Sequence, residues 1–215
     1  MTRIPVAERR RALIEATIRV IVRDGVAAAS TRAVAAEAQM SLASLHYAFG
    51  SRDALLRAVA EEVTDAELVA ARDGLLLFDE GAGQIPLVEL LQVGVDRFVD
   101  LLVEHPEREL ALAELTVHAR RTGMDDLLDH VRAVYLAAAE QNLVHAAAQA
   151  HVRWTVPVAE AAQMLVMLLD GLTWSWTGRR DEAIARRSGR FAAEALARLA
   201  VPVDDVVHPI DRHPR

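Results

Sequence analysis

The residues best suited to a chemical task are Ser51 and Arg52, which stand at the start of a predicted helix. A serine at such a position accepts a hydrogen bond from one unpaired N–H group of the first helical turn. The other N–H groups, the positive end of the helix dipole and the guanidinium then favour a bound anion. We therefore expect Ser51 and Arg52 to contact a phosphate group.

Motifs for catalysis are absent from the sequence. The eight histidines show no H-E-x-x-H motif and no other metal-ligand spacing, and the chain has no cysteine. Neither G-x-S-x-G, nor a phosphate-binding glycine loop, nor a dinucleotide fingerprint occurs. We expect a protein that is not an enzyme, with no catalytic residue, no metal site and no cofactor.

The elements that must position Ser51 and Arg52 are helices. The sequence is rich in alanine and aliphatic residues, with 10 glycines and 7 prolines in 215 residues, which favours helix. Cap and stop residues predict about nine helices, over 8–24, 32–38, 42–48, 52 to about 78, 85–104, 107–122, 124–150, 157–178 and 180–200. The predicted fold is all-α: a three-helix N-terminal domain followed by a larger helical domain.

Residues 31–48 are predicted to form a helix-turn-helix. Ser30-Thr31 and Ser41 are expected to cap two short helices that a tight turn joins. The second helix fits the major groove of DNA, where its N-terminal residues reach base edges. Its exposed residues would be Leu42, Ala43, Ser44, His46 and Tyr47.

Charge is unevenly divided along the chain. The formal net charge is −7, and all 24 basic residues are arginine. Residues 1–57 hold nine arginines and five acidic residues, a balance of +4, so the remainder carries −11. The acidic total argues against nucleic acid, whereas a basic N-terminal quarter indicates such a partner there. A solvated charged surface would give the same division.

Residues 31–56 read TRAVAAEAQMSLASLHYAFGSRDALL. They resemble the N-terminal signature of TetR-family (tetracycline-repressor-like) transcriptional regulators, roughly T-x-x-x-I-A-x-x-A-G-V-S-x-G-x-L-Y-x-H-F-x-S-K-x-x-L. The resemblance implies a DNA-binding helix-turn-helix. The residues that it implies at the DNA are Thr31, Arg32, Ser41, Leu42, Ala43, Ser44, His46, Tyr47, Ser51 and Arg52.

Several residues depart from the family pattern. Gln39 stands where the family usually has glycine, so this turn must form without the residue that favours left-handed backbone. Arg52 replaces a common lysine and would offer a planar fork to phosphate. Tyr47 stands where the family often packs an aromatic ring on the DNA backbone. Outside this motif, His46 could be an ordinary surface histidine and Tyr47 a half-buried aromatic.

The resemblance implies that the larger domain binds a ligand and dimerises. Two apolar stripes at helical spacing suit a four-helix interface built from two helices of each chain. Alternatively, both stripes face the core of their own chain. The candidate interface residues are Leu165, Leu168, Leu172, Trp176, Phe191, Ala195 and Leu199.

A small-molecule pocket would be mostly apolar with a few polar groups. Asp170 lies in the most apolar stretch of the chain, where it could line a wet cavity, pair with an arginine or bond to backbone groups. Gly171 beside it predicts the close approach of another backbone. The other ligand-binding candidates, each of which could be a plain core residue, are Phe98, Leu102, Leu115, His118, Tyr135, Met164, Met167 and Trp174.

We divide the chain into a DNA-binding domain (1–56), a ligand-binding and dimerisation domain (57–201) and a loose tail (202–215). No secretory signal and no uninterrupted apolar stretch of about 18–20 residues is visible, so we expect a cytoplasmic protein. The predicted function is a homodimeric repressor that binds a palindromic operator in double-stranded DNA and is released by a small molecule. The alternative is a helical protein-interaction or small-molecule-binding module without operator recognition.

Overall fold

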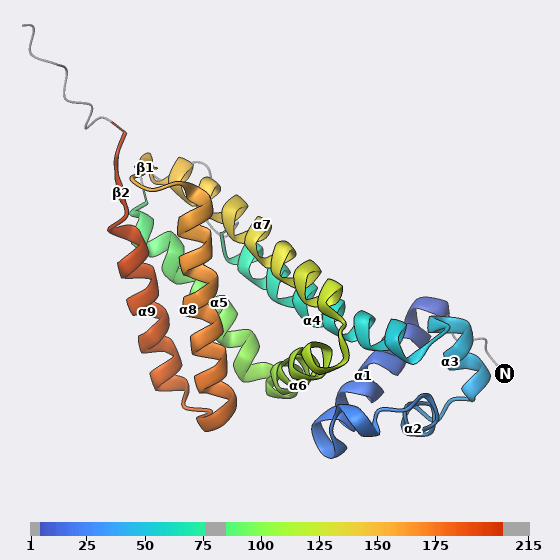
Figure 1. Ribbon diagram of the computed structural model, residues 1–215. Coiled ribbons are helices and arrows are strands. Elements are labelled where there is room, and N and C mark those ends of the chain that lie inside the picture. Colours follow the sequence, from blue (N-terminus) through green and yellow to red (C-terminus); the bar gives the residue numbers. More distant parts are fainter. Residues whose placement is uncertain (1–4, 76–84, 204–215) are drawn as a thin grey trace, which may run out of the picture.

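The computed structural model describes residues 5–75 and 85–203 (Figure 1). Their elements are α1 (Val6–Asp24), the 3₁₀ turn η1 (Val26–Ala28), α2 (Thr31–Glu37), α3 (Leu42–Phe49), α4 (Arg52–Leu75), α5 (Leu87–Glu104), α6 (Pro106–Thr122), α7 (Asp125–Gln149), β1 (Val152–Trp154), α8 (Val158–Arg179), α9 (Glu182–Ala197) and β2 (Ala200–Pro202). The all-α prediction is confirmed for these residues, apart from the two short strands. The predicted helix end at 76–78, the loop at 79–84 and most of the tail, 204–215, lie outside them.

The short helices begin at serine caps. Ser41 Oγ accepts a hydrogen bond from the backbone N–H of Ser44 at 3.1 Å. At α2 the cap is Ser30, whose Oγ accepts from the N–H of Ala33 at 3.2 Å. Of the predicted cap signal Ser30-Thr31, Ser30 is therefore the cap, and the expectation that Thr31 itself caps the helix is wrong. Thr31 is the first helical residue, because the residue before it has the extended backbone of a cap.

A head and a body occupy opposite ends of the molecule (Figure 1). The head consists of α1, α2, α3 and the first half of α4, closed around a buried apolar cluster that includes Leu13, Val34, Leu45 and Leu56. Helix α4 continues from the head into the body, where it packs beside α5 and α7. One rigid helix thus joins the two ends.

Helix α6 also belongs to both parts. Its Ala111 and Leu115 are buried in the apolar cluster of the head. Arg108 Nη2 donates to Glu15 Oε1 of α1 at 2.6 Å, and the backbone N–H of Val26 donates to Glu114 Oε2 at 3.2 Å. The core of the head therefore extends beyond the first 56 residues.

The body packs α4, α5, α7, α8 and α9 around two apolar clusters. Helix α9 lies against α5 at Gly189, where an added Cβ would be 2.5 Å from Val95 Cγ1. At Gly171 no atom of the chain lies within 4 Å of an added Cβ. The close approach predicted at Gly171 is therefore not found among the described residues of the chain, whereas Gly189, which was not predicted, has one.

A small antiparallel sheet closes the end of the body. Arg153 of β1 pairs with Val201 of β2, and the ring N–H of Trp154 donates to the carbonyl of Leu143 at 3.3 Å. The sequence analysis missed this sheet, because alternation over three residues cannot be distinguished from a loop. Its second strand follows α9 and includes the first residue of the predicted tail, Pro202.

Candidate nucleic-acid interface

Helix α3 presents one face to the core of the head and the other to solvent. Leu45 is fully buried, whereas 70% of Tyr47 is exposed. Ala43 and His46 are also exposed, and Leu42 and Ser44 are half-buried. The residues predicted to read DNA therefore lie on or beside the outer face of this helix.

The turn between α2 and α3 is tight although it contains no glycine. Gln39 has φ 54°, in the left-handed region, and the N–H of Met40 donates to the carbonyl of Ala35 at 2.8 Å. The prediction that this turn forms without a glycine is confirmed. A side chain in this conformation costs about 1 kcal/mol.

Ser51 and Arg52 begin α4 as predicted, but the arginine side chain is already engaged. Arg52 Nε donates to the carbonyl of Ala29 at 2.9 Å, and Nη2 donates to the carbonyl of Val26 at 2.6 Å. Ser51 Oγ accepts from the N–H of Ala54 at 3.1 Å. A contact of phosphate with the Nε side of Arg52 would require both carbonyl bonds to break, whereas the N–H groups of Nη1 and the second N–H of Nη2 are not used by these bonds. Arg52 is therefore first a brace between α4 and η1.

Ion pairs neutralise part of the positive charge of the head. Arg19 and Arg23 of α1 both contact Glu37 of α2 at 2.9 Å, and these hydrogen bonds lower the pKa of the Glu37 carboxyl. Arg57 pairs with Asp126 of α7 at 2.9 Å. These three arginines hold helices together, so their charge is less available to DNA. The balance of +4 already counts Glu37, whereas Asp126 lies outside residues 1–57.

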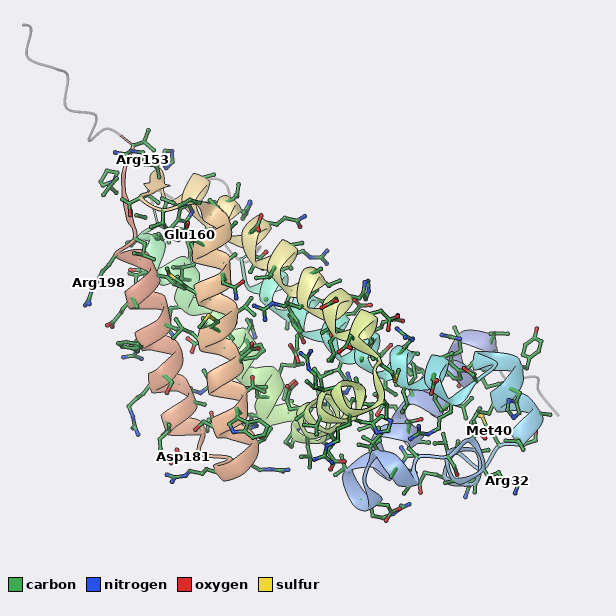
Figure 2. The ribbon with its side chains drawn as sticks, in the orientation of Figure 1. Arg32, Met40, Arg153, Glu160, Asp181 and Arg198 are labelled. Carbon is green, nitrogen blue, oxygen red and sulfur yellow. The ribbon has the colours of Figure 1, made fainter. Side chains whose placement is uncertain are left out.

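Other arginines of the head lie at or near its surface. Arg32 is exposed on α2, on the outer side of the head (Figure 2). Arg10 lies over the ring of Phe49, 4.2 Å from its centre, and donates to the carbonyl of Ala48. This contact holds the end of α3 against α1.

The predicted dimer residues are divided between core and surface. Leu172 and Trp176 are buried in the chain's own core, so they offer little surface to a second chain. Phe191 is 65% exposed on α9. The remaining four are half-buried: Leu165, Leu168, Ala195 and Leu199.

The predicted ligand residues do not converge on one site. Phe98 and Leu102 are buried in the body, and Leu115 is buried in the head. The most exposed of them belong to α8: Met164, Met167 and Trp174. Trp174 and His118 line an open groove of about 610 Å³ between η1, α6 and α8.

Asp170 is exposed on α8, although it stands in the most apolar stretch of the sequence. The apolar residues around it in sequence lie on other faces of α8, because a helix turns successive side chains through about 100°. Partial loss of hydration still raises the pKa of Asp170, against the opposing charge of Arg132.

A buried acidic cluster in the body was missed by the sequence analysis. Glu67 of α4 and Glu109 of α6 are 5% and 4% exposed. Tyr135 of α7 donates to Glu67 Oε2 at 2.6 Å. Glu67 stands four residues after Val63 and three after Thr64, both buried, so the helical period of α4 was a signal for its burial.

Burial dominates the electrostatics of this acidic cluster. It raises the pKa of Glu67 well above its usual range, and the Glu109 carboxyl adds to the rise. Burial also raises the pKa of Glu109, against the opposing effects of the Glu67 carboxyl and the Arg108 charge. The pKa of Tyr135 is raised too, first by burial and then by Glu67, so its hydroxyl remains a donor.

Comparisons with known proteins agree with this arrangement. The family of bacterial regulatory proteins described as the tetR family matches residues 13–59. The HTH-type nicotine-responsive transcriptional repressor HdnoR of Paenarthrobacter nicotinovorans is 32% identical over 170 residues, which are 79% of this chain and 84% of that protein.

Solved structures show the same fold. A TetR-family transcriptional regulator from Rhodococcus sp. has a TM-score of 0.72 and 23% identity, covering 88% of this chain and 99% of its own. The multidrug binding protein EbrR, complexed with imidazole, has a TM-score of 0.62 and 26% identity, covering 92% and 98%. No helix among the described residues is long and apolar enough to cross a membrane.

A helix-turn-helix whose second helix faces outward, joined to a larger helical body, defines a DNA-binding transcriptional regulator. The chain belongs to the TetR family of bacterial regulatory proteins, whose members act by binding DNA and not as enzymes.

Proposed function

We propose that the protein represses transcription as a homodimer on a palindromic operator and leaves the operator when a small molecule binds its body. The observation that carries this proposal is the outward face of α3, with Tyr47 70% exposed above a fully buried Leu45. A bacterial regulator of this kind works on chromosomal DNA, and hence in the cytoplasm.

The DNA contacts divide into base-reading and phosphate-binding groups. Ala43, His46 and Tyr47 lie on the exposed face of α3, which enters the major groove, with Leu42 and Ser44 beside them. The phosphate-binding group comes from the starts of the three helices: Thr31, Arg32, Ser41, Ser51 and the remaining donors of Arg52. These positions follow the family motif.

The dimer forms through α8 and α9. These helices expose Met164, Met167, Trp174 and Phe191 and border a hollow of about 460 Å³ lined by Leu168, Gly171 and Phe191. Exposed apolar side chains on two neighbouring helices favour association, and two-fold pairing would place two heads on successive major grooves.

Phe191→Glu should convert the dimer into monomers, because the substitution puts a charge into an apolar contact. The matched control is Val144→Glu on α7, where an apolar residue that is 55% exposed, against 65% for Phe191, lies outside the α8–α9 surface. Sedimentation analysis measures the outcome. A Phe191→Glu protein that remains dimeric would place the interface elsewhere.

The effector is a small organic molecule. HdnoR, which is similar to this chain in sequence, is a nicotine-responsive repressor, and EbrR, which shares this fold, is a multidrug binding protein. We assign the effector to the body, where α4 and α6 both reach the head.

Selection of bound fragments from a random DNA pool tests the operator. We expect enrichment of a palindrome whose half-sites are about 10–10.5 base pairs apart or a multiple of that spacing. Failure to distinguish any selected palindrome from random duplex would overturn operator recognition. Binding of a partner protein but not DNA would support the interaction-module alternative.

A further inference from the structure

The acidic cluster of the body has unused hydrogen-bonding capacity. Glu67 Oε1 and Thr64 Oγ1 are buried beside the Glu109 carboxyl and the Tyr135 hydroxyl, and neither atom makes a well-formed hydrogen bond within the described residues. Thr64 is 2% exposed and Glu67 is 5% exposed. A buried acceptor without a partner costs about 1–3 kcal/mol, and this deficit suits a site that a ligand completes.

No ion pair with Glu67 or Glu109 is found among the described residues. The charge of Arg108 acts on Glu109, but its hydrogen bond goes to Glu15 on α1. Arg132 acts on Asp170 and is exposed. Among the residues that the structure describes, no three side chains could hold a metal ion together. The missing positive charge is therefore better supplied by an organic group than by a metal.

An apolar cavity begins one helical turn away from Glu67. Ala71, four residues further along α4, lines this cavity together with Phe98, Leu143 and Leu169. The cavity is about 70 Å³, whereas pockets for drug-sized ligands are about 300–1,000 Å³. A ligand that occupies it must therefore spread the helices around it.

We infer that the effector is an organic cation whose positive centre lies between the carboxyl groups of Glu67 and Glu109 and whose apolar part enters the adjoining cavity. This inference rests on the proposed release by an effector and adds its chemical class. Tyr135 and Thr64 supply a hydroxyl each at the polar end.

The two carboxyl groups lie on the helices that hold the head. Helix α4 carries Glu67 and, at its start, the Arg52 brace to η1. Helix α6 carries Glu109 and, within two turns, Leu115 in the core of the head. A cation that draws these carboxyls together while its apolar part spreads the helices changes the angle between α4 and α6. The head must follow this change.

Binding of a permanent cation should release a proton. The groups that face Glu67 are Glu109 from α6, Tyr135 from α7 and Asp170 from α8, with Arg108 acting on Glu109 and Arg132 on Asp170. In the free protein the raised pKa keeps a proton on the carboxyl pair. A bound positive charge favours the ionised form, so affinity should rise with pH by up to about tenfold per unit for one linked proton.

The probes are phenyltrimethylammonium, which cannot titrate, and tert-butylbenzene, its neutral counterpart of nearly the same shape. Calorimetric titration of the full-length protein, in buffers of different ionisation enthalpy, measures both affinity and proton release. We expect the cation to bind at least about tenfold more tightly than the neutral compound and to release a proton. Equal affinity, or no binding of the cation at about 1 mM, would overturn the inference.

Variants identify the residues. Glu67→Gln and Glu109→Gln should each weaken phenyltrimethylammonium binding by about tenfold or more and reduce proton release. Glu61→Gln, which changes an exposed carboxyl on the same helix α4, should have no effect. Unchanged affinity in both buried variants would overturn the assignment. Circular dichroism checks that the Glu67→Gln and Glu109→Gln proteins are folded. If they are not, proton release by the wild-type protein still tests the inference.

Operator binding by the wild-type protein, measured on DNA selected from the random pool, separates this inference from the proposed function. If no operator is bound, the proposed function fails while charge-dependent cation binding still supports the site. If the operator is bound but the cation and its neutral counterpart bind equally, the inference alone fails.

Discussion

Replacing Arg52 by alanine should destabilise the protein, because its side chain joins α4 to the turn η1. Two donors are lost, one at 2.9 Å from the carbonyl of Ala29 and one at 2.6 Å from that of Val26. Hydrogen bonds from charged donors contribute about 1.5–3 kcal/mol each, but Arg52 is half-buried and water can reach the carbonyls. We therefore expect Arg52→Ala to lower the free energy of unfolding by about 2–3 kcal/mol in total. In a chain of this size, that loss lowers the melting temperature by about 4–12 °C.

Thermal and urea unfolding of the Arg52→Ala protein measure this loss. Arg52→Lys should recover only part of it, because one ammonium group cannot match the spacing of two carbonyls served by a guanidinium fork. Arg32→Ala is the control, since Arg32 is exposed and should leave stability within about 0.5 kcal/mol. A melting temperature unchanged by Arg52→Ala would refute the brace.

The same variant separates the brace from a phosphate contact. Each lost phosphate contact lowers the salt dependence of DNA binding by about 0.9 per head. A lower slope together with a lower melting temperature would show that Arg52 serves both roles. A lower melting temperature with an unchanged slope would remove Arg52 from the DNA contacts.

Three further substitutions test the turn, the recognition helix and the acidic cluster. Gln39→Gly should stabilise the protein by at most about 1 kcal/mol, because glycine adopts the left-handed backbone of this position without strain. The control Ala36→Gly, at an exposed position of α2, should destabilise the protein by about 1 kcal/mol. Equal losses of stability in unfolding experiments would contradict this reasoning. Tyr47→Ala should weaken operator binding by about tenfold in gel-shift titrations without changing the melting temperature; unchanged affinity would exclude Tyr47 from the interface. The raised pKa values of Glu67 and Glu109 mean that the folded protein binds more protons than the unfolded chain, so wild-type stability should fall as pH rises from about 5 to about 8. Glu67→Gln should gain stability relative to wild type over this interval, and parallel melting curves at all pH values would show that the carboxyl is not perturbed.

The head was predictable because its signals are local. Ser41 caps its helix through its own side chain, and the motif around Gln39 and Leu45 fixes which residues face inward. A cap depends on residues three positions apart, so composition and spacing suffice to predict it. Arg52 was placed correctly at the start of α4, but its carbonyl partners lie more than 20 residues away, and no local pattern names them.

The body was predictable in its helices but not in their contacts. The apolar stripe predicted for α8 lies on one side of the helix, but its members Leu172 and Trp176 are buried in the chain's own core. The apolar residues of α8 that face solvent are Met167 and Trp174, which lie outside the predicted stripe. Apolar periodicity indicates that a face is buried and not which neighbour covers it. Glu67 was missed because an acidic residue is expected at the surface, although its helical position lies on a buried face.

The sharing of α6 limits how far this regulator can be treated as two exchangeable modules. Ala111 and Leu115 complete the core of the head, and Glu114 and Arg108 bond to η1 and α1. A chimera that joins a foreign head at residue 57 would lose these matched surfaces and expose an apolar side of α6. Engineered fusions should carry these four residues with the head from which they came.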